Sequence, residues 1–467
     1  MSIFQTSVWA YNHFSNAKLG DTRRTNRLVN VADLAAKSSG ESIARACDGK
    51  DSAIEGAYRL IRNEHIKPHE IRNSGFAYTA SQAHEFNEII AIDDTTSLSY
   101  KHSVAGSLGK LGKETDKARG WWVHSTLLLD GLTTKTIGLI TQDWWLRPNE
   151  YAESDEKESG KWSDSSYFMR NRLGSEMKKV ISVCDREADF FDYMVDKLDH
   201  EERFVIRAKH NRKLEDGTKL FDFVATQESI GSYTIEVPQK GVRNKRTGKV
   251  KNRPKRKAKL TVKTANTTIK SMNINVIHAE EVGEEEDKLS WTLLTTEPVN
   301  NLEAAMKIID IYTARWRIED FHKSWKTGSG VERLRMTRAD NLERVASLLA
   351  FIGVRLLQLK EALTVSIYLK KKGLMKEAEL HENTKCDRVL EEDEWKLLLY
   401  LQPQWSMKTS TIPTLKEAYE AIAKLGGFYD SKRTGIASWE TIWNGWSKLQ
   451  DTLIGYRAAK EFMKIDK

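Results

Sequence analysis

The chain has 467 residues and a formal net charge of +8, because its 74 Lys and Arg residues outnumber its 66 Asp and Glu residues. This length predicts two or three domains, and the moderate basic excess favours a polyanionic partner such as nucleic acid. Three scattered cysteines argue against a disulfide framework or a zinc site and fit a reducing cytoplasm. The sequence shows neither a secretion leader nor an apolar run of about eighteen residues, so we expect neither secretion nor a membrane partner.

Residues 1–67 are predicted to form a separate helical, DNA-binding domain. Apolar residues recur at helical spacing before Gly40 and again between residues 54 and 61. The polar faces carry many guanidinium groups, which suit duplex phosphates and groove edges, although a solvated face is equally common for such a segment alone. The basic side chains are Arg23, Arg24 and Arg45, together with four predicted DNA contacts, Arg27, Lys37, Arg59 and Arg62.

A helix from Pro68 to about Phe86 precedes three apolar runs that predict an antiparallel meander. The first run, Ile89–Ile92, suits a strand buried on both faces. It ends in Asp93, Asp94 and two threonines, a tetrapeptide that more commonly caps a strand with an Asx or ST turn. The second and third runs, residues 121–129 and 136–146, flank a turn containing Asp-Gly.

A polar stretch from Pro148 to Trp162 is predicted to be mobile and to precede a helix. A second buried strand over residues 180–184 then stops at Asp185, and alternation along the strand turns Cys184 away from Asp185 into the core. A helix over 188–198, a strand over 203–208 and a late helix follow. This order predicts an α/β fold with an RNase H-like catalytic domain at residues 68–367, in which carboxylates at strand ends and on the late helix converge.

A β-rich insertion is predicted at about residues 209–290. Alternating runs near residues 233–237 and 258–262 indicate strands, and the dense basic tract between them indicates a flexible arm. Binding to a DNA backbone is favoured over a solubilising loop for this tract. Residues 283–287 are acidic and predict a solvated turn. The tract includes the predicted DNA contacts Lys240, Arg243 and Arg253.

The late helix, predicted over Ile311–Trp325, begins a spacing that organises the candidate site. Tyr312, Arg315, Glu319 and Lys326 fall at i, i+3, i+7 and i+14, within about 60° of one another on an α-helix. This face would place one metal-binding carboxylate among groups that hold phosphates. An exposed helix with i,i+4 ion pairs is the simpler interpretation, but the distant Asp94 and Asp185 favour a site. His322 is expected to face solvent, with assistance in proton transfer as the alternative.

Residues 368–467 are predicted to form a helical dimerisation domain. Thr414 and Glu417 form a capping-box signature before a helix that should end near Gly426 and Gly427. A last, long amphipathic helix carries three tryptophans and two leucines on one stripe, which is typical of a core or a subunit interface. The stripe consists of Trp439, Trp443, Trp446, Leu449 and Leu453.

Motifs along nearly the whole chain carry a likeness to a known family. AIDDTTSLSY, VCDREAD, IDIYTARWRIEDFHKSWKTG and GGFYDSKRTGIASW are among them, and the pattern is weakest in the first fifteen residues and around residues 365–413. They resemble the cut-and-paste DDE transposases of bacterial composite transposon five and its insertion-sequence relatives, whose Tyr-x2-Arg-x3-Glu-x6-Lys signature is met here. One departure is Asp93, where the family pattern has Glu.

The resemblance implies a retroviral-integrase-like transposase with Asp94, Asp185 and Glu319 as catalytic, metal-binding triad. It implies that Trp291 holds a flipped base. It also implies a homodimer on paired double-stranded DNA ends that cuts both strands through a hairpin and joins the 3′ ends to target DNA, in a bacterial cytoplasm at the nucleoid. The predicted contacts to DNA phosphates are Tyr312, Arg315 and Lys326, with Lys323, Arg207 and Lys209 beside them.

Phosphodiester chemistry explains these residue types. Two divalent ions about 3.5 to 4 Å apart serve the attacking and leaving oxygens, and Mg²⁺, with Mn²⁺ as a substitute, prefers such hard oxygen ligands. Our hypothesis is that Asp94 bridges the ions and that Asp185 and Glu319 each complete one side. The alternatives are an RNase H-like nuclease or resolvase, against which the basic insertion and terminal domains argue, and a catalytically silent DNA-binding regulator, against which the intact triad argues.

Overall fold

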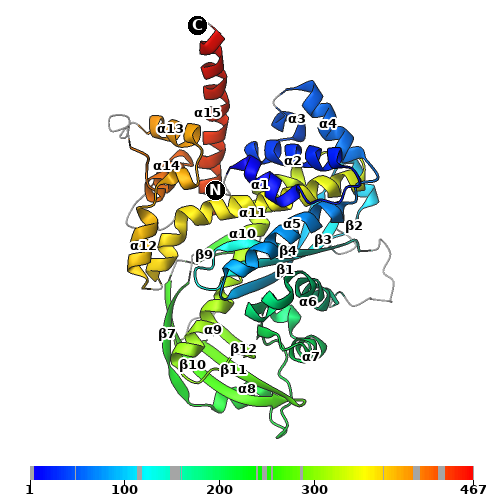
Figure 1. The fold of residues 1–467 in the computed structure, drawn as a ribbon. Helices are drawn as coiled ribbons and strands as arrows, with labels where there is room; N and C mark the ends of the chain where they lie inside the picture. Colours follow the sequence, from blue (N-terminus) through cyan, green and yellow to red (C-terminus); the bar gives the residue numbers. More distant parts are fainter. Residues whose placement is uncertain are drawn as a thin grey trace.

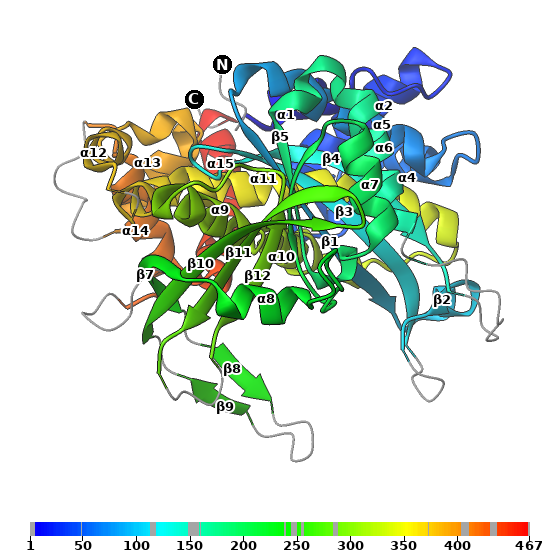
Figure 2. The same ribbon diagram turned by 90° about the horizontal axis from the view of Figure 1, so that it is seen from below.

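The computed structural model describes most of the chain, and the two views in Figures 1 and 2 show its arrangement. A mixed sheet runs through the centre, helices cover both of its faces, and the C-terminal helices lie at one end (Figure 1). No helix in these described ranges has the length and apolar character needed to cross a membrane. The described residues are 5–47, 49–112, 118–147, 158, 160–237, 240–243, 250–253, 256–283, 288–371, 373–402, 411–429 and 437–465.

The N-terminal helices form where helical spacing predicts them, and they bury their apolar stripes against the rest of the molecule. Asp21 caps the second helix by accepting a hydrogen bond from the Arg23 amide. The rings of Phe14 and Phe76 both pack on Phe351, with centroids 5.7 and 5.6 Å apart, so this segment shares one core with the catalytic region. The helices are α1 (Thr6–Phe14), α2 (Thr22–Lys37), α3 (Ile43–Ala46), α4 (Asp51–Arg62) and α5 (Pro68–Gln82).

The first part of the sheet has the RNase H-like arrangement that the sequence predicts. β1 pairs antiparallel with β3, and β3 pairs antiparallel with β4, which confirms the meander. On its other side β1 pairs parallel with β5, and β5 pairs parallel with β6. The strands are β1 (Ile89–Tyr100), β2 (Gly109–Lys110), β3 (Arg119–Asp130), β4 (Thr136–Trp145), β5 (Val180–Cys184) and β6 (Arg203–Arg207).

The first strand differs from its prediction. It does not stop in a turn at Asp93 but continues in extended conformation to Tyr100, because β3 pairs with it along its whole length. Only Ile89–Ile92 also pair with β5, which explains why only these residues are apolar on both faces. From Asp93 onward β1 therefore lies beside a notch in the sheet.

Two helices cover the sheet face that carries Asp93. α6 (Gly160–Leu173) begins before Trp162, where the sequence predicts a mobile stretch, and residues 148–157 and 159 of that stretch lie outside the described residues. α7 (Phe191–Asp199) begins three residues later than predicted, because a 3-10 turn over Arg186–Ala188 precedes it. Cys184 is fully buried, as alternation along β5 predicts.

The insertion continues the same sheet. β12 pairs with β6, so the strand order runs from β6 through β12, β11 and β10 to β7. The described parts of the basic tract form an antiparallel pair, β8 with β9, in place of the predicted flexible arm. Residues 284–287 of the predicted acidic turn lie outside the described residues. The elements are α8 (Leu220–Thr226), β7 (Ser229–Val237), β8 (Lys240–Arg243), β9 (Val250–Arg253), β10 (Arg256–Ile269), β11 (Met272–Glu281) and β12 (Ser290–Thr295).

The late helix is interrupted, and this corrects the single helical face predicted over Ile311–Trp325. α9 (Leu302–Ala314) ends in hydrogen bonds between residues three positions apart, as in a 3-10 helix. The Arg315 amide donates to the Tyr312 carbonyl at 3.2 Å, and the Trp316 amide donates to the Thr313 carbonyl at 3.3 Å. α10 (Arg317–Lys323) follows, and then a π-helical turn over Ser324–Gly328. Tight turns advance the chain by more than 100° per residue and π turns by less, so the uniform rotation on which the prediction was based does not hold over this segment.

α11 (Ala339–Lys371) connects the catalytic region to the C-terminal helices. The domain boundary predicted between residues 367 and 368 falls inside this helix. The capping box of Thr414 and Glu417 is confirmed, and α14 ends before Gly426 as expected. Trp446, Leu449 and Leu453 of the predicted stripe are buried in the core of this region, while Trp443 is partly buried and the side chain of Trp439 lies outside the described residues. The remaining helices are α12 (Met375–Glu382), α13 (Glu392–Tyr400), α14 (Leu415–Leu425) and α15 (Trp439–Ile465).

Candidate active site

Asp94 and Asp185 lie level with each other on neighbouring strands. The parallel register pairs Ile89 with Val180 and Ile92 with Val183. Continuing this register by two residues places Asp94 beside Asp185, one strand away, and neighbouring strands are about 4.8 Å apart. β5 ends at Cys184, so both carboxylates border the notch, and the Asp94 side chain remains 27% exposed there.

Glu319 is a third carboxylate whose charge, like that of Asp185, acts on Asp94. It lies on α10, which packs against β1. The pKa of Asp94 is raised to about 6, mainly by burial and to a smaller extent by the negative charges of Asp185 and Glu319, whereas the positive charge of Arg315 opposes this rise. The structure therefore brings the three predicted triad residues into one electrostatic field.

The donor set fits a hard divalent ion in its chemistry. Three carboxylates supply oxygen ligands of the kind that Mg²⁺ and Mn²⁺ prefer, and solvent reaches the Asp94 side chain, which is 27% exposed. Among the described residues, no group of three or more His, Cys, Asp or Glu side chains is arranged closely enough to hold a metal ion.

His322 is buried, so the prediction that it faces solvent is wrong. Its Nδ1 lies 3.7 Å from Oδ2 of Asp94, which is too long for a direct hydrogen bond. Burial lowers the pKa of His322 to about 3, so the imidazole is neutral, and its Nε2 has no hydrogen-bond partner within the described chain. Ile318, Phe321 and His322 share the inner face of α10, and their i, i+3, i+4 spacing was the sequence signal for this burial.

The signature residues around the triad differ in how far their side chains are buried. Tyr312 and Trp291 are both buried, with ring centroids 5.9 Å apart, so neither ring lies open for a base or phosphate. Arg315 is half-buried, and no hydrogen-bond partner for its Nε occurs in the described residues. Burial lowers the pKa of Lys326, which is also half-buried. Of this set, Arg315 is the cation whose charge reaches Asp94.

The other predicted DNA contacts lie at several places. Arg207 donates to the Ser290 carbonyl at 3.0 Å, and Lys209 and Lys323 are exposed. The side chains of the basic tract residues lie outside the described residues, so the structure gives no position for their charges; they are Lys240, Arg243 and Arg253.

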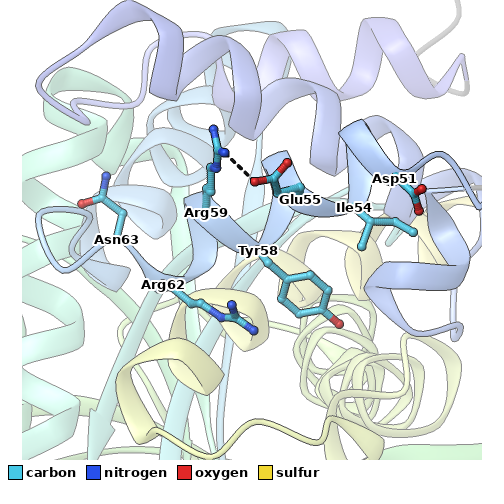
Figure 3. Close-up of a pocket in the computed structure, with 7 residues that line it drawn as sticks. All are labelled: Asp51, Ile54, Glu55, Tyr58, Arg59, Arg62 and Asn63. Atoms are coloured by element: carbon cyan, nitrogen blue, oxygen red, sulfur yellow. Dashed lines mark hydrogen bonds and ion pairs between the residues drawn. The ribbon is translucent and has the colours of Figure 1, made fainter.

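The cations of the N-terminal helices are exposed. Lys37 forms an ion pair with Asp33, and Arg59 forms one with Glu55. Arg27 extends toward α4, where its guanidinium would meet any side chain replacing Gly56. An open hollow of about 600 Å³ runs along α4, with Arg62 resting on the Tyr58 ring on one side and the Arg59–Glu55 pair on the other (Figure 3). None of the triad residues lines this hollow.

A buried polar network behind the triad was missed by the sequence analysis. Asp93 is buried, accepts a hydrogen bond from Thr126 and lies 3.6 Å from the Cys184 thiol. Burial raises the pKa of Asp93 to about 6. Lys197 is fully buried and bonds Ser182 at 2.9 Å and Glu202 at 2.7 Å. These contacts fix the ends of β1 and β5, where the first two carboxylates lie.

Two parts of the chain match known families. Residues 6–66 match the family model described as transposase DNA-binding, and residues 193–352 match the transposase DDE domain. The chain carries the domains of a DNA transposase. The match to the DDE domain includes Glu319 and begins after Asp94 and Asp185. DDE transposase domains depend on divalent metal ions, in agreement with the carboxylate donors found here.

One solved structure with a related arrangement is the piggyBac transposase in a synaptic complex with hairpin DNA. The similarity covers 85% of this chain and 88% of that one, with 10% sequence identity and a TM-score of 0.38. These values are too low to transfer any property of that protein to this transposase. The RNase H-like assignment therefore stands on the strand pairing and on the matched DDE domain.

Proposed function

We propose that this transposase binds the inverted ends of a transposon as a dimer, cuts both strands through a hairpin intermediate, and joins the freed 3′ ends to target DNA. The transposases of composite transposon five and its insertion-sequence relatives, which the sequence resembles, are its proposed kin. The observation that carries the proposal is the common electrostatic field of Asp94, Asp185 and Glu319 at a notch of an RNase H-like sheet.

In this proposal the three carboxylates hold two Mg²⁺ ions. When bound, such ions lower the barrier to phosphodiester attack by activating the nucleophilic oxygen and stabilising the leaving oxygen. Arg315, whose charge already acts on Asp94, is positioned to neutralise the scissile phosphate. Lys326 and Lys323 follow Glu319 on the next turns and contact neighbouring phosphates. The N-terminal cations and the basic tract contact the flanking backbone.

A cleavage assay tests the proposal. Purified protein is incubated with a labelled duplex carrying the inverted ends of its own element, with and without Mg²⁺, and the products are resolved on a denaturing gel. We expect metal-dependent nicks followed by hairpins and double-strand breaks. Asp94→Ala should bind the duplex and leave it uncut, while Asp199→Ala, a change at an exposed residue of α7, should cut as the parent does.

Other outcomes would identify the alternatives. Cleavage of the ends without joining to target DNA would indicate an RNase H-like nuclease. Binding without cleavage in either Mg²⁺ or Mn²⁺ would indicate a silent DNA-binding regulator. Equal cleavage by Asp94→Ala and the parent would remove Asp94 from the triad.

A further inference from the structure

Three N–H donors converge on one carboxylate beside the catalytic notch. Arg147 donates to Glu158 from Nε at 2.5 Å and from Nη2 at 2.6 Å, and the Trp145 indole donates to the same carboxylate at 3.1 Å. These hydrogen bonds lower the pKa of Glu158, and those from Arg147 have the largest effect. Glu158 is therefore an anion at neutral pH. The arrangement is a bidentate fork with a third donor.

Strand elements hold these donors in place. Trp145 lies directly opposite Trp122 in the pairing of β4 with β3. The Arg147 guanidinium rests on the Trp122 ring at 4.1 Å, and the Arg147 carbonyl accepts from the Lys110 amide of β2 at 3.3 Å. A guanidinium stacked on an aromatic ring keeps its fork oriented. The donor geometry therefore depends on β2, β3 and β4, whereas Glu158 precedes α6.

This donor group is continuous with the triad. Trp122 pairs with Ser97 of β1, three residues beyond Asp94, which corresponds to about 10 Å along a strand. Lys161 lies between this donor group and the triad. Its Nζ is 5.6 Å from the Trp145 ring and 3.4 Å from the carboxylate of Glu187, which is two residues after Asp185. DNA whose scissile phosphate occupies the notch would pass within reach of Arg147.

We propose that Arg147, Trp145 and Lys161 form a binding site for a DNA backbone phosphate, and that the Glu158 carboxylate occupies this site until DNA replaces it. An arginine fork matches a phosphate as well as a carboxylate. Arg147 and Glu158 are each 38% exposed, so solvent and a DNA phosphate can reach the pair and compete for the fork. This inference rests on the proposed function, because it requires DNA in the catalytic notch.

The test measures the affinity of the full-length protein for a labelled transposon-end duplex in Ca²⁺ over a range of salt concentrations. Arg147→Gln should weaken binding and reduce the slope of log K against log salt by about 0.9 per lost phosphate contact. Glu158→Gln should instead tighten binding about twofold to fivefold, because the competing carboxylate is neutralised. Glu392→Gln removes the same charge from an exposed ion pair on α13 and should change nothing.

A second arm uses pre-cut ends and measures joining to target DNA. Opposite effects of Arg147→Gln and Glu158→Gln on end binding identify a phosphate of the transposon end, and opposite effects on joining alone identify target DNA. A purely structural ion pair would make both variants lose affinity, and that result, or no change in either arm, overturns the inference. A parent protein that binds and cuts no end DNA would instead contradict the proposed function itself.

Discussion

At the scale of single residues, the negative charge of Asp94 is unfavourable in the folded protein. Asp94 is held in a largely buried position beside two other carboxylates, and its pKa of about 6 lies above the usual value of 3.8. A carboxyl whose pKa is raised by folding favours the folded state while it is protonated, and this stability is lost as the pH rises from about 4 to about 6. At neutral pH the ionised Asp94 therefore destabilises the fold that positions it.

Asp94→Asn should consequently stabilise the protein while abolishing cleavage. In metal-free buffer at pH 7.5 we expect the free energy of unfolding to rise by roughly 1 to 3 kcal/mol, and the difference should shrink toward zero below about pH 4. Urea unfolding at several pH values measures this change. Asp451→Asn at an exposed position is the control and should show no such pH dependence. A destabilised Asp94→Asn at pH 7.5 would contradict the assigned burial.

His322 gives a second prediction at this scale. Its neutral imidazole borders Asp94, and groups that border a metal-binding carboxylate typically change activity about 10-fold to 100-fold when replaced. His322→Gln should slow end cleavage by that factor while leaving end binding in Ca²⁺ unchanged. His84→Gln, at an exposed histidine, is the matched control. Cleavage by His322→Gln at the parental rate would leave the histidine as a packing residue only.

At the scale of elements, the placement of Glu319 depends on how α10 is anchored. Arg317 of α10 pairs with Glu361 of α11 at 3.3 Å. Glu361 is buried and also accepts hydrogen bonds from the Thr136 amide at 2.7 Å and hydroxyl at 2.9 Å, at the start of β4. One carboxylate thus joins α10, α11 and β4.

Removing this carboxylate should loosen the whole junction. Glu361→Ala leaves the Thr136 amide and the Arg317 guanidinium without their partner, and breaking a buried ion pair in this way costs about 3 to 5 kcal/mol. Glu361→Gln keeps an acceptor and should cost less. Urea unfolding compares both with Glu392→Ala at an exposed position, which should be nearly neutral. Equal stability of Glu361→Ala and the parent would show that α10 is held elsewhere.

Local patterns in the sequence predicted most elements but not their continuations. Ile89–Ile92, residues 121–129 and residues 180–184 are mostly apolar because they are buried by neighbours on both sides, and each lies in a strand. The extension of β1 beyond Asp93 was missed because its pairing with β3 is made by backbone atoms, which leave little trace in side-chain polarity. The pairing of β12 with β6 joins residues about ninety positions apart, and no local pattern reports it.

In the candidate site, too, the sequence predicted some features, and others depend on tertiary packing. Asp94, Asp185 and Glu319 were found from residue type and motif, and the strand register explains how the first two meet. The supports were not found, because Lys197, Glu202 and Glu361 read as surface charges in the sequence and are buried only through tertiary packing. The inward face of His322 was visible in the spacing of Ile318, Phe321 and His322, but the assumed unbroken helix concealed it.

At the scale of the whole molecule, α15 extends beyond the C-terminal core, and Figure 1 shows its last turns projecting from the body. Several of its apolar side chains are exposed, with Ile454 at 56%, Phe462 at 65% and Met463 at 69%. Leu449 and Leu453 on the same helix are buried in the C-terminal core. These exposed apolar side chains on α15 support the proposed dimer.

Charged substitutions at the exposed apolar residues of α15 should therefore prevent dimer formation. The double variant Phe462→Glu with Met463→Glu places two carboxylates where apolar contact is expected, and we expect a monomer on paired-end DNA where the parent is a dimer. Light scattering of the protein with and without end DNA measures the mass. Tyr167→Glu, at a 56% exposed aromatic residue of α6, is the control. An unchanged dimer would place the interface elsewhere.

The shared ladder of β6 and β12 also decides how this protein can be shortened. Excising residues 209–290 would remove β7 to β11, and the edge of β12 that pairs with β11 would then present an open row of backbone donors and acceptors. Such an edge recruits other strands, so a truncated core made this way would precipitate instead of folding as an independent unit. The strands of the insertion thus cover an edge of the whole sheet. A smaller version of the enzyme must keep β12 and the strands β11, β10 and β7 that continue the sheet beyond it.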